Sequence, residues 1–172
     1  MIGKMSHNQF IINNLKLPET LIELIQTDQW KPPKDKSGIK KILELPEDLK
    51  TKFDPFDDYI YFGTYTLDLM KKESLGIQKW TKRQGFGCMF LGALDEMVKP
   101  GNIDFNKSIL IADLGIGSDS PFVLDYRDDI KNPSVIMIRW GKDPIKDNRW
   151  MKVTDNFDEF VEIIGIKAPN NA

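Results

Sequence analysis

The sequence predicts an α+β fold: a single domain in which a twisted antiparallel sheet is flanked by helices. Three observations carry this prediction. They are a helical pattern near the N-terminus, four strand-like apolar runs between residues 109 and 153, and an amphipathic helical pattern after residue 156. The connections between the apolar runs are short, and parallel pairing would need crossovers of about a dozen residues, so we expect antiparallel neighbours. No charged linker or low-complexity stretch divides the chain, and we assign all of 1–172 to one domain.

The first part of the chain contains helix signals separated by proline-rich breaks. A helix is predicted over residues 17–29, with Pro18 at its first position and leucine and isoleucine side chains along one face. Pro32 and Pro33 end this stretch, because proline cannot continue a helix. A second Leu-Pro-Glu start follows at residues 45–47.

The middle of the chain is less regular. Residues 59–62 are aromatic and are compatible with a strand, whereas residues 66–80 favour a short helix. The Lys-Pro-Gly-Asn sequence at residues 99–102 predicts a turn.

The last third gives the clearest prediction. Strands are expected at residues 109–112, 122–126, 134–140 and 150–153, because each is an apolar run bounded by turn-forming residues. Together they form a meander of antiparallel strands.

A helix with signals at both ends follows the meander. Asn156 is the expected N-cap, Glu159 completes a capping box three residues later, and Gly165 ends the helix. The predicted buried stripe consists of Phe157, Phe160, Val161 and Ile164.

Composition removes several classes of function. The chain has one cysteine, Cys88, and one histidine, His7, so an internal disulfide is impossible and catalysis by histidine depends on a single N-terminal residue. We expect a protein that is not an enzyme and that binds no metal. No apolar run reaches the roughly 20 residues of a membrane helix, and the start of the chain lacks a secretory signal pattern. We therefore expect a cytoplasmic protein that does not bind membranes.

A glycine motif provides the strongest enzyme alternative. Residues 109–117 resemble the strand and glycine turn of an S-adenosylmethionine-dependent methyltransferase, which would need a helix after the glycines. Asp119 stands where a third glycine is expected, and Asp125 ends the next apolar run too soon for such a helix. Gly115 and Gly117 are better explained as part of a hairpin or bulge between antiparallel strands, so no cofactor is expected.

Acidic residues gather in two parts of the chain. Most aspartates of this kind cap turns or face solvent, and a cluster of them can also bind a divalent cation. Acidic loops beside a sheet can instead occupy a basic cleft of a partner protein. The candidate partner-binding residues are Asp54, Asp57, Asp58, Asp119, Asp128 and Asp129. Asp113 and Asp125 are expected to bond the backbone of the hairpin instead.

Basic residues are also grouped, in residues 31–41 and around residues 139–152, the second group near two tryptophans. Stacking on such aromatics could bind nucleic acid, but the net charge is −2 and acidic residues interrupt the patch. We therefore expect no direct nucleic-acid binding. Trp30, Trp80, Trp140 and Trp150 are expected to pack in the core or at its rim.

Several motifs of the chain share the order and spacing of one known superfamily. The first is an N-terminal helical element, here residues 17–45, with residues 17–25 followed by Trp30 and Pro32. The others lie in the best-matched core, residues 104–166: residues 108–115, the run 121–127 ending in Leu-Asp-Tyr-Arg, the turn 132–135, and the closing strand and helix 150–160. In this order of motifs, the chain resembles members of the SUKH superfamily. One departure is the sequence Asp-Pro-Phe-Asp-Asp at residues 54–58, where members of the superfamily often have Asn-Gly.

The resemblance implies an α+β domain that has no cofactor and no catalytic residues and acts through protein–protein contact. The superfamily includes a fungal regulator of cell-wall glucan synthesis and many bacterial immunity proteins that neutralise a cognate toxin domain, often a nuclease. An immunity protein is therefore the expected function, with a toxin domain as its partner. A regulatory or scaffold protein is the alternative, and the sequence leaves the oligomeric state open.

Overall fold

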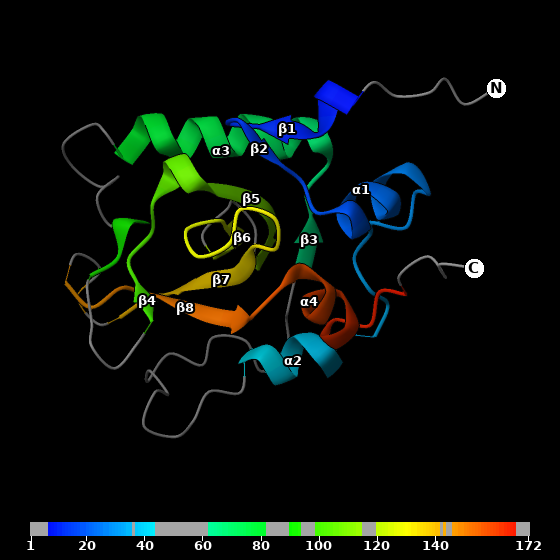
Figure 1. Cartoon of the computed structure of the whole chain (residues 1–172). Coiled ribbons are helices and arrows are strands. Elements are labelled where there is room, and N and C mark those ends of the chain that lie inside the picture. The colour runs from blue at the N-terminus through cyan, green and yellow to red at the C-terminus, as the bar shows by residue number, and fades with distance from the viewer. Residues whose placement is uncertain are drawn as a thin grey trace.

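A six-stranded sheet lies at the centre of the computed structural model, with strand order β3-β5-β6-β7-β8-β4 and antiparallel pairing throughout (Figure 1). The structure describes residues 7–35, 37–43, 62–81, 90–93, 99–114, 120–141, 143 and 146–167. The strands are β3 (Phe62–Thr64), β4 (Pro100–Gly101), β5 (Ser108–Leu114), β6 (Pro121–Asp125), β7 (Ser134–Arg139) and β8 (Arg149–Thr154). The antiparallel α+β fold predicted from the sequence is thereby confirmed.

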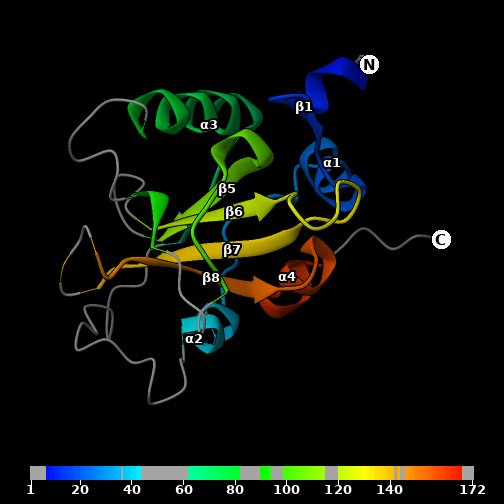
Figure 2. The same cartoon turned by 60° about the vertical axis from the view of Figure 1, so that its left-hand side comes forward.

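Four α-helices pack against this sheet: α1 (Glu19–Gln26), α2 (Ser37–Leu43), α3 (Leu67–Thr81) and α4 (Phe157–Ile163). In both views α3 lies above β5, whereas α2 lies below β8 (Figures 1 and 2). Two short 3-10 helices, η1 (His7–Phe10) and η4 (Phe105–Lys107), precede β1 and β5. None of the helices in the described part of the chain combines the length and apolar character needed to cross a bilayer.

The four predicted strands correspond to β5, β6, β7 and β8, and the two predicted helices around residues 17–29 and 66–80 correspond to α1 and α3. Pro18 precedes α1 with an extended ψ of 143° and is its N-cap rather than its first helical residue. The predicted turn at residues 99–102 is present, because the Asn102 amide donates to the Pro100 carbonyl oxygen at 2.8 Å. Pro100 and Gly101 also pair with β8 as the edge strand β4.

A two-stranded hairpin that was not predicted lies before α1: β1 (Ile11–Ile12) pairs with β2 (Leu15–Lys16). Asn13 and Asn14 connect the strands with φ angles of 53° and 63°. Positive φ at both central residues is the requirement of a type I′ turn, in which asparagine is favoured.

An aromatic cluster fills the side of the sheet that α4 covers. Phe122 lies 5.6 Å from Phe62 and 5.2 Å from Phe160 between ring centroids, and Trp30 lies 5.6 Å from Phe157. All five side chains are buried. Such ring pairs are stabilised by edge and tilted contacts in addition to the apolar area they bury.

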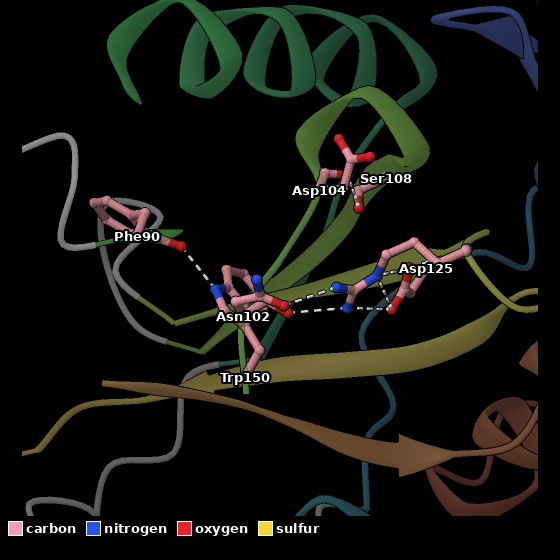
Figure 3. Close-up of polar contacts among 7 residues, drawn as sticks. Phe90, Asn102, Asp104, Ser108, Asp125 and Trp150 are labelled. Atoms are coloured by element: carbon pink, nitrogen blue, oxygen red, sulfur yellow. Dashed lines mark hydrogen bonds and ion pairs between the residues drawn. The ribbon is translucent and has the colours of Figure 1, made fainter. Parts of the chain in front are cut away.

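A second buried site lies around Trp150, which is fully inaccessible to solvent. Its indole Nε1 donates to the Phe90 carbonyl oxygen at 2.6 Å (Figure 3). Its ring meets the Phe105 ring edge-on, with 6.2 Å between the ring centroids. Trp140 is half-buried and packs against Phe90. Core or rim packing is thus confirmed for Trp30, Trp140 and Trp150, whereas the Trp80 side chain lies outside the described residues.

The ends of α4 agree with their sequence signals. The Asn156 side chain accepts a hydrogen bond from the Glu159 amide at 2.9 Å, and Gly165 ends the helix with φ +75°. The Glu159 carboxylate accepts from the Asp155 amide rather than from the Asn156 amide, so the capping box is shifted by one residue. The four predicted core residues of this helix are all buried.

Candidate functional site

The glycine motif lies between two antiparallel strands. β5 and β6 pair from Ser108 opposite Asp125 to Asp113 opposite Pro121, and the connecting residues 115–119 lie outside the described residues. The Leu114 amide donates to the Ser120 carbonyl oxygen at 3.1 Å, which closes the connection. A methyltransferase-type site requires a helix and a parallel strand after the glycines, and the antiparallel pairing contradicts that arrangement.

Asp113 has the structural role predicted for it. Its Oδ1 accepts a hydrogen bond from the Ser120 amide at 3.0 Å, so this buried carboxylate joins the two strands where they meet the connection. A bulge between Leu110 and Ala112 interrupts the pairing, and the Leu110 amide donates to the buried Ser74 hydroxyl of α3 at 3.0 Å. Every contact of this hairpin described above is internal to the domain.

Asp125 and Arg127, from the Leu-Asp-Tyr-Arg motif, form a clamp that also includes Asn102. Figure 3 labels Asp125 and Asn102. The guanidinium donates through Nε and Nη2 to the Asp125 carboxylate at 2.7–3.0 Å. It also donates to the Asn102 side-chain and backbone oxygens at 3.0 and 2.9 Å. Only 6% of the Asp125 side chain is exposed, so the pair lies in a low dielectric and attaches the chain after β4 to the end of β6.

Tyr126, the third residue of this motif, attaches another part of the fold. Its hydroxyl donates to the Lys16 carbonyl oxygen of β2 at 2.8 Å, and its ring is buried. Burial raises the pKa of the Tyr126 hydroxyl far above its ordinary value. The motif therefore positions the hairpin β1–β2 and the segment after β4, and its polar groups point inward.

The turn after this motif is an exposed acidic feature of the described residues. We call residues 128–131 the acidic turn. Asp129 Oδ1 accepts hydrogen bonds from the Lys131 and Asn132 amides at 2.8 and 3.2 Å, which fixes the turn backbone. Asp128 and Asp129 are exposed. Ile130, which follows Asp129 in the turn, is 60% exposed.

The structure therefore brings together two of the six predicted partner-binding residues, Asp128 and Asp129. The others, Asp54, Asp57, Asp58 and Asp119, lie outside the described residues, as does Cys88. Residues 115–119 and the acidic turn connect to opposite ends of β6. Within the part of the chain that the structure describes, no three His, Cys, Asp or Glu side chains are placed to hold a metal ion together.

A second surface feature, which was not predicted from the sequence, is a hollow of about 280 Å³ between α2, α4 and the strands β7 and β8. We call it the α2–α4 groove. Its walls are Lys41 and Ile42 of α2, Met137 and Arg139 of β7, Met151 of β8 and Ile163 of α4. Met137 pairs with Met151 across the two strands, so their side chains share one face and form the floor.

Arg139 is the charged group inside this groove. Its Nη2 donates to the Ile42 carbonyl oxygen at 3.3 Å, whereas its buried Nε has no hydrogen-bond partner. Burial lowers the pKa of Arg139 from its ordinary value, because desolvation disfavours the charged form. The sequence indicates that Met137 and Arg139 lie on the same face of β7, because side chains alternate along a strand. It does not indicate that α2 lies over that face.

Comparison with known proteins gives no relative: no family model matches the chain, and neither a curated protein nor a solved structure matches it.

Proposed function

We propose that this protein is a non-catalytic, cytoplasmic binding module of the immunity type, which neutralises a toxin domain by docking on it through the acidic turn. The observation that carries the proposal is Ile130, an aliphatic side chain 60% exposed and held beside two carboxylates on a turn with a fixed backbone. The resemblance of the motif order to the SUKH superfamily supports the same class of function.

The chemistry of the turn suits a basic partner. Exposed carboxylates accelerate encounter with a positively charged surface, and a buried apolar anchor then supplies much of the affinity. The Asp129 cap keeps Ile130 in place before binding, which reduces the entropy lost on docking. A nuclease, whose active-site cleft must attract phosphates, is the kind of toxin domain that this surface fits.

Co-purification with the protein encoded by the adjacent gene, followed by calorimetry, tests the proposal. Ile130→Ser should weaken binding about 30-fold, since anchors of this kind contribute roughly 2 kcal/mol or more. The double variant Asp128→Asn/Asp129→Asn should slow association and reduce the salt dependence, because asparagine keeps the turn cap and removes only the charge.

The matched control is Asp28→Asn/Glu162→Gln, which removes two exposed carboxylates elsewhere and should leave binding unchanged. A partner that binds all three variants equally well would show that the acidic turn is not the interface. If no adjacent gene encodes a toxin, and the protein instead forms a stable complex with a cell-wall synthesis protein, the scaffold alternative is supported.

A further inference from the structure

The α2–α4 groove holds a positive charge that the described residues do not neutralise. Arg139 carries five N–H donors, and the Ile42 carbonyl oxygen is the one partner they have among the residues described. No carboxylate in this part of the chain forms an ion pair with Arg139. A buried donor without a partner destabilises the fold, and a negatively charged group that pairs with the Arg139 guanidinium would offset this cost.

A second cation borders the same groove. Lys41 of α2 lines it and is exposed. Lys152 of β8 also borders it, but it follows Met151 on the strand, so its side chain points to the other face of the sheet, and its ammonium contacts Asp155 at 2.9 Å. Arg139 and Lys41 therefore favour an anionic occupant.

The floor of the groove is apolar and adaptable. Met137 and Met151 lie side by side on it, and Ile163 closes one wall with 39% of its surface exposed. Methionine side chains are flexible and polarisable, and they accommodate apolar groups of different shapes. The occupant must consequently carry an apolar group next to its negative charge.

The occupant has to fit a hollow of about 280 Å³ between α2, α4 and the sheet. We propose that the α2–α4 groove is a second docking site, which receives an acidic segment of a protein partner. One aliphatic side chain of that segment enters between the two methionines, and a neighbouring carboxylate pairs with Arg139.

This site is separate from the acidic turn and does not depend on it. In both views α2 lies below β8, whereas the turn between β6 and β7 lies above β8 (Figures 1 and 2). The two surfaces also have opposite charge, so they select different segments of a partner or different partners.

The test uses the full chain labelled with 13C at its methionine methyl groups, whose resonances are assigned by substitution. The probe is the capped peptide acetyl-Gly-Asp-Leu-Asp-Gly-amide. We expect saturable shifts at Met137 and Met151 and a weakening of about tenfold or more in Arg139→Gln, because hydrogen bonds to charged groups are among the stronger ones. Peptides in which asparagine replaces both aspartates, or glycine replaces the leucine, should bind at least several-fold more weakly.

Two controls keep the result interpretable. Lys79→Gln on α3 removes an exposed cation far from the groove and should bind the peptide as the wild type does. If Arg139→Gln does not fold, Lys41→Gln changes one exposed residue of the groove and should still weaken binding several-fold.

Several results would overturn the proposal: unchanged binding in the groove variants, shifts confined to other methionines, or hexanoate saturating the groove while the peptide does not. The last result would identify a site for small amphiphilic carboxylates. Asp128→Asn/Asp129→Asn should bind the peptide normally, so failure here is distinguishable from failure of the acidic turn as an interface.

Discussion

Replacement of Arg127 by methionine removes the clamp that joins β6 to the chain after β4. The substitution keeps an unbranched side chain of similar length and deletes the guanidinium. It breaks three contacts to the Asp125 carboxylate and two to Asn102, all between 2.7 and 3.0 Å. Asp125 would keep the hydrogen bond from the Arg127 amide at 3.2 Å, which does not neutralise its charge.

The expected loss follows from burial. Removing one partner of a buried ion pair costs about 3–5 kcal/mol, because it leaves the other charge uncompensated. The Arg127 side chain is 22% exposed, and water can solvate part of the site, so we expect the lower end, about 3 kcal/mol. In a domain of this size that loss corresponds to a decrease in Tm of roughly 6–12 °C.

Urea denaturation of four proteins measures this effect: the wild type, Arg127→Met, Asp125→Asn and the double variant. The double variant should lose less free energy of unfolding than the sum of the single variants, since it leaves no buried charge behind. Lys107→Met, at an exposed lysine of η4, is the control and should stay within about 0.5 kcal/mol of the wild type. A loss below about 0.5 kcal/mol in Arg127→Met, or strictly additive losses, would refute the clamp.

Three other substitutions test the fold and the groove by the same denaturation assay. Asn156→Ala should cost about 1 kcal/mol through loss of the α4 cap. Arg139→Met should raise the free energy of unfolding by about 1 kcal/mol, because an apolar side chain replaces a donor without a partner, and a decrease would contradict this reasoning. Tyr126 keeps its proton when folded, whereas an unfolded tyrosine ionises near pH 10, so stability should fall as the pH rises above about 10. Tyr126→Phe should make that fall shallower, and equal pH profiles would argue against a buried hydroxyl.

The strands that could be predicted are those whose sequence is a continuous apolar run between turn residues. β5, β6 and β7 are apolar on both faces because helices and the described residues 90–93 and 99–107 pack against the sheet. The sequence therefore shows continuous apolar runs between turn residues. The hairpin β1–β2 and the edge strand β4 have two residues each, too short for any periodicity. For these, the Asn-Asn pair and the Pro-Gly pair were the available signals, and both predict turns more directly than strands.

The candidate sites follow the same division. The positions of Asp128 and Asp129 in a turn could be predicted, because aspartate next to two short apolar runs indicates a connection. The exposure of Ile130 could not, since an isolated isoleucine is usually buried. The α2–α4 groove brings together residues 41 and 163, which are more than a hundred positions apart, and such a hollow appears only once the helices are placed on the sheet.

The residues from which a superfamily resemblance was predicted are structural and do not form a partner surface. Asp125, Tyr126 and Arg127 turn their polar groups to other parts of the domain, and Asn156 caps a helix. These contacts determine the scaffold, so substitutions there should change stability rather than partner choice. Under the proposed function, specificity comes instead from the acidic turn and the α2–α4 groove. The exposed side chains of these two surfaces are not needed to stabilise the fold. A module built in this way can change its partner by changing a few exposed residues, because the contacts that stabilise the fold and those that bind are made by different side chains.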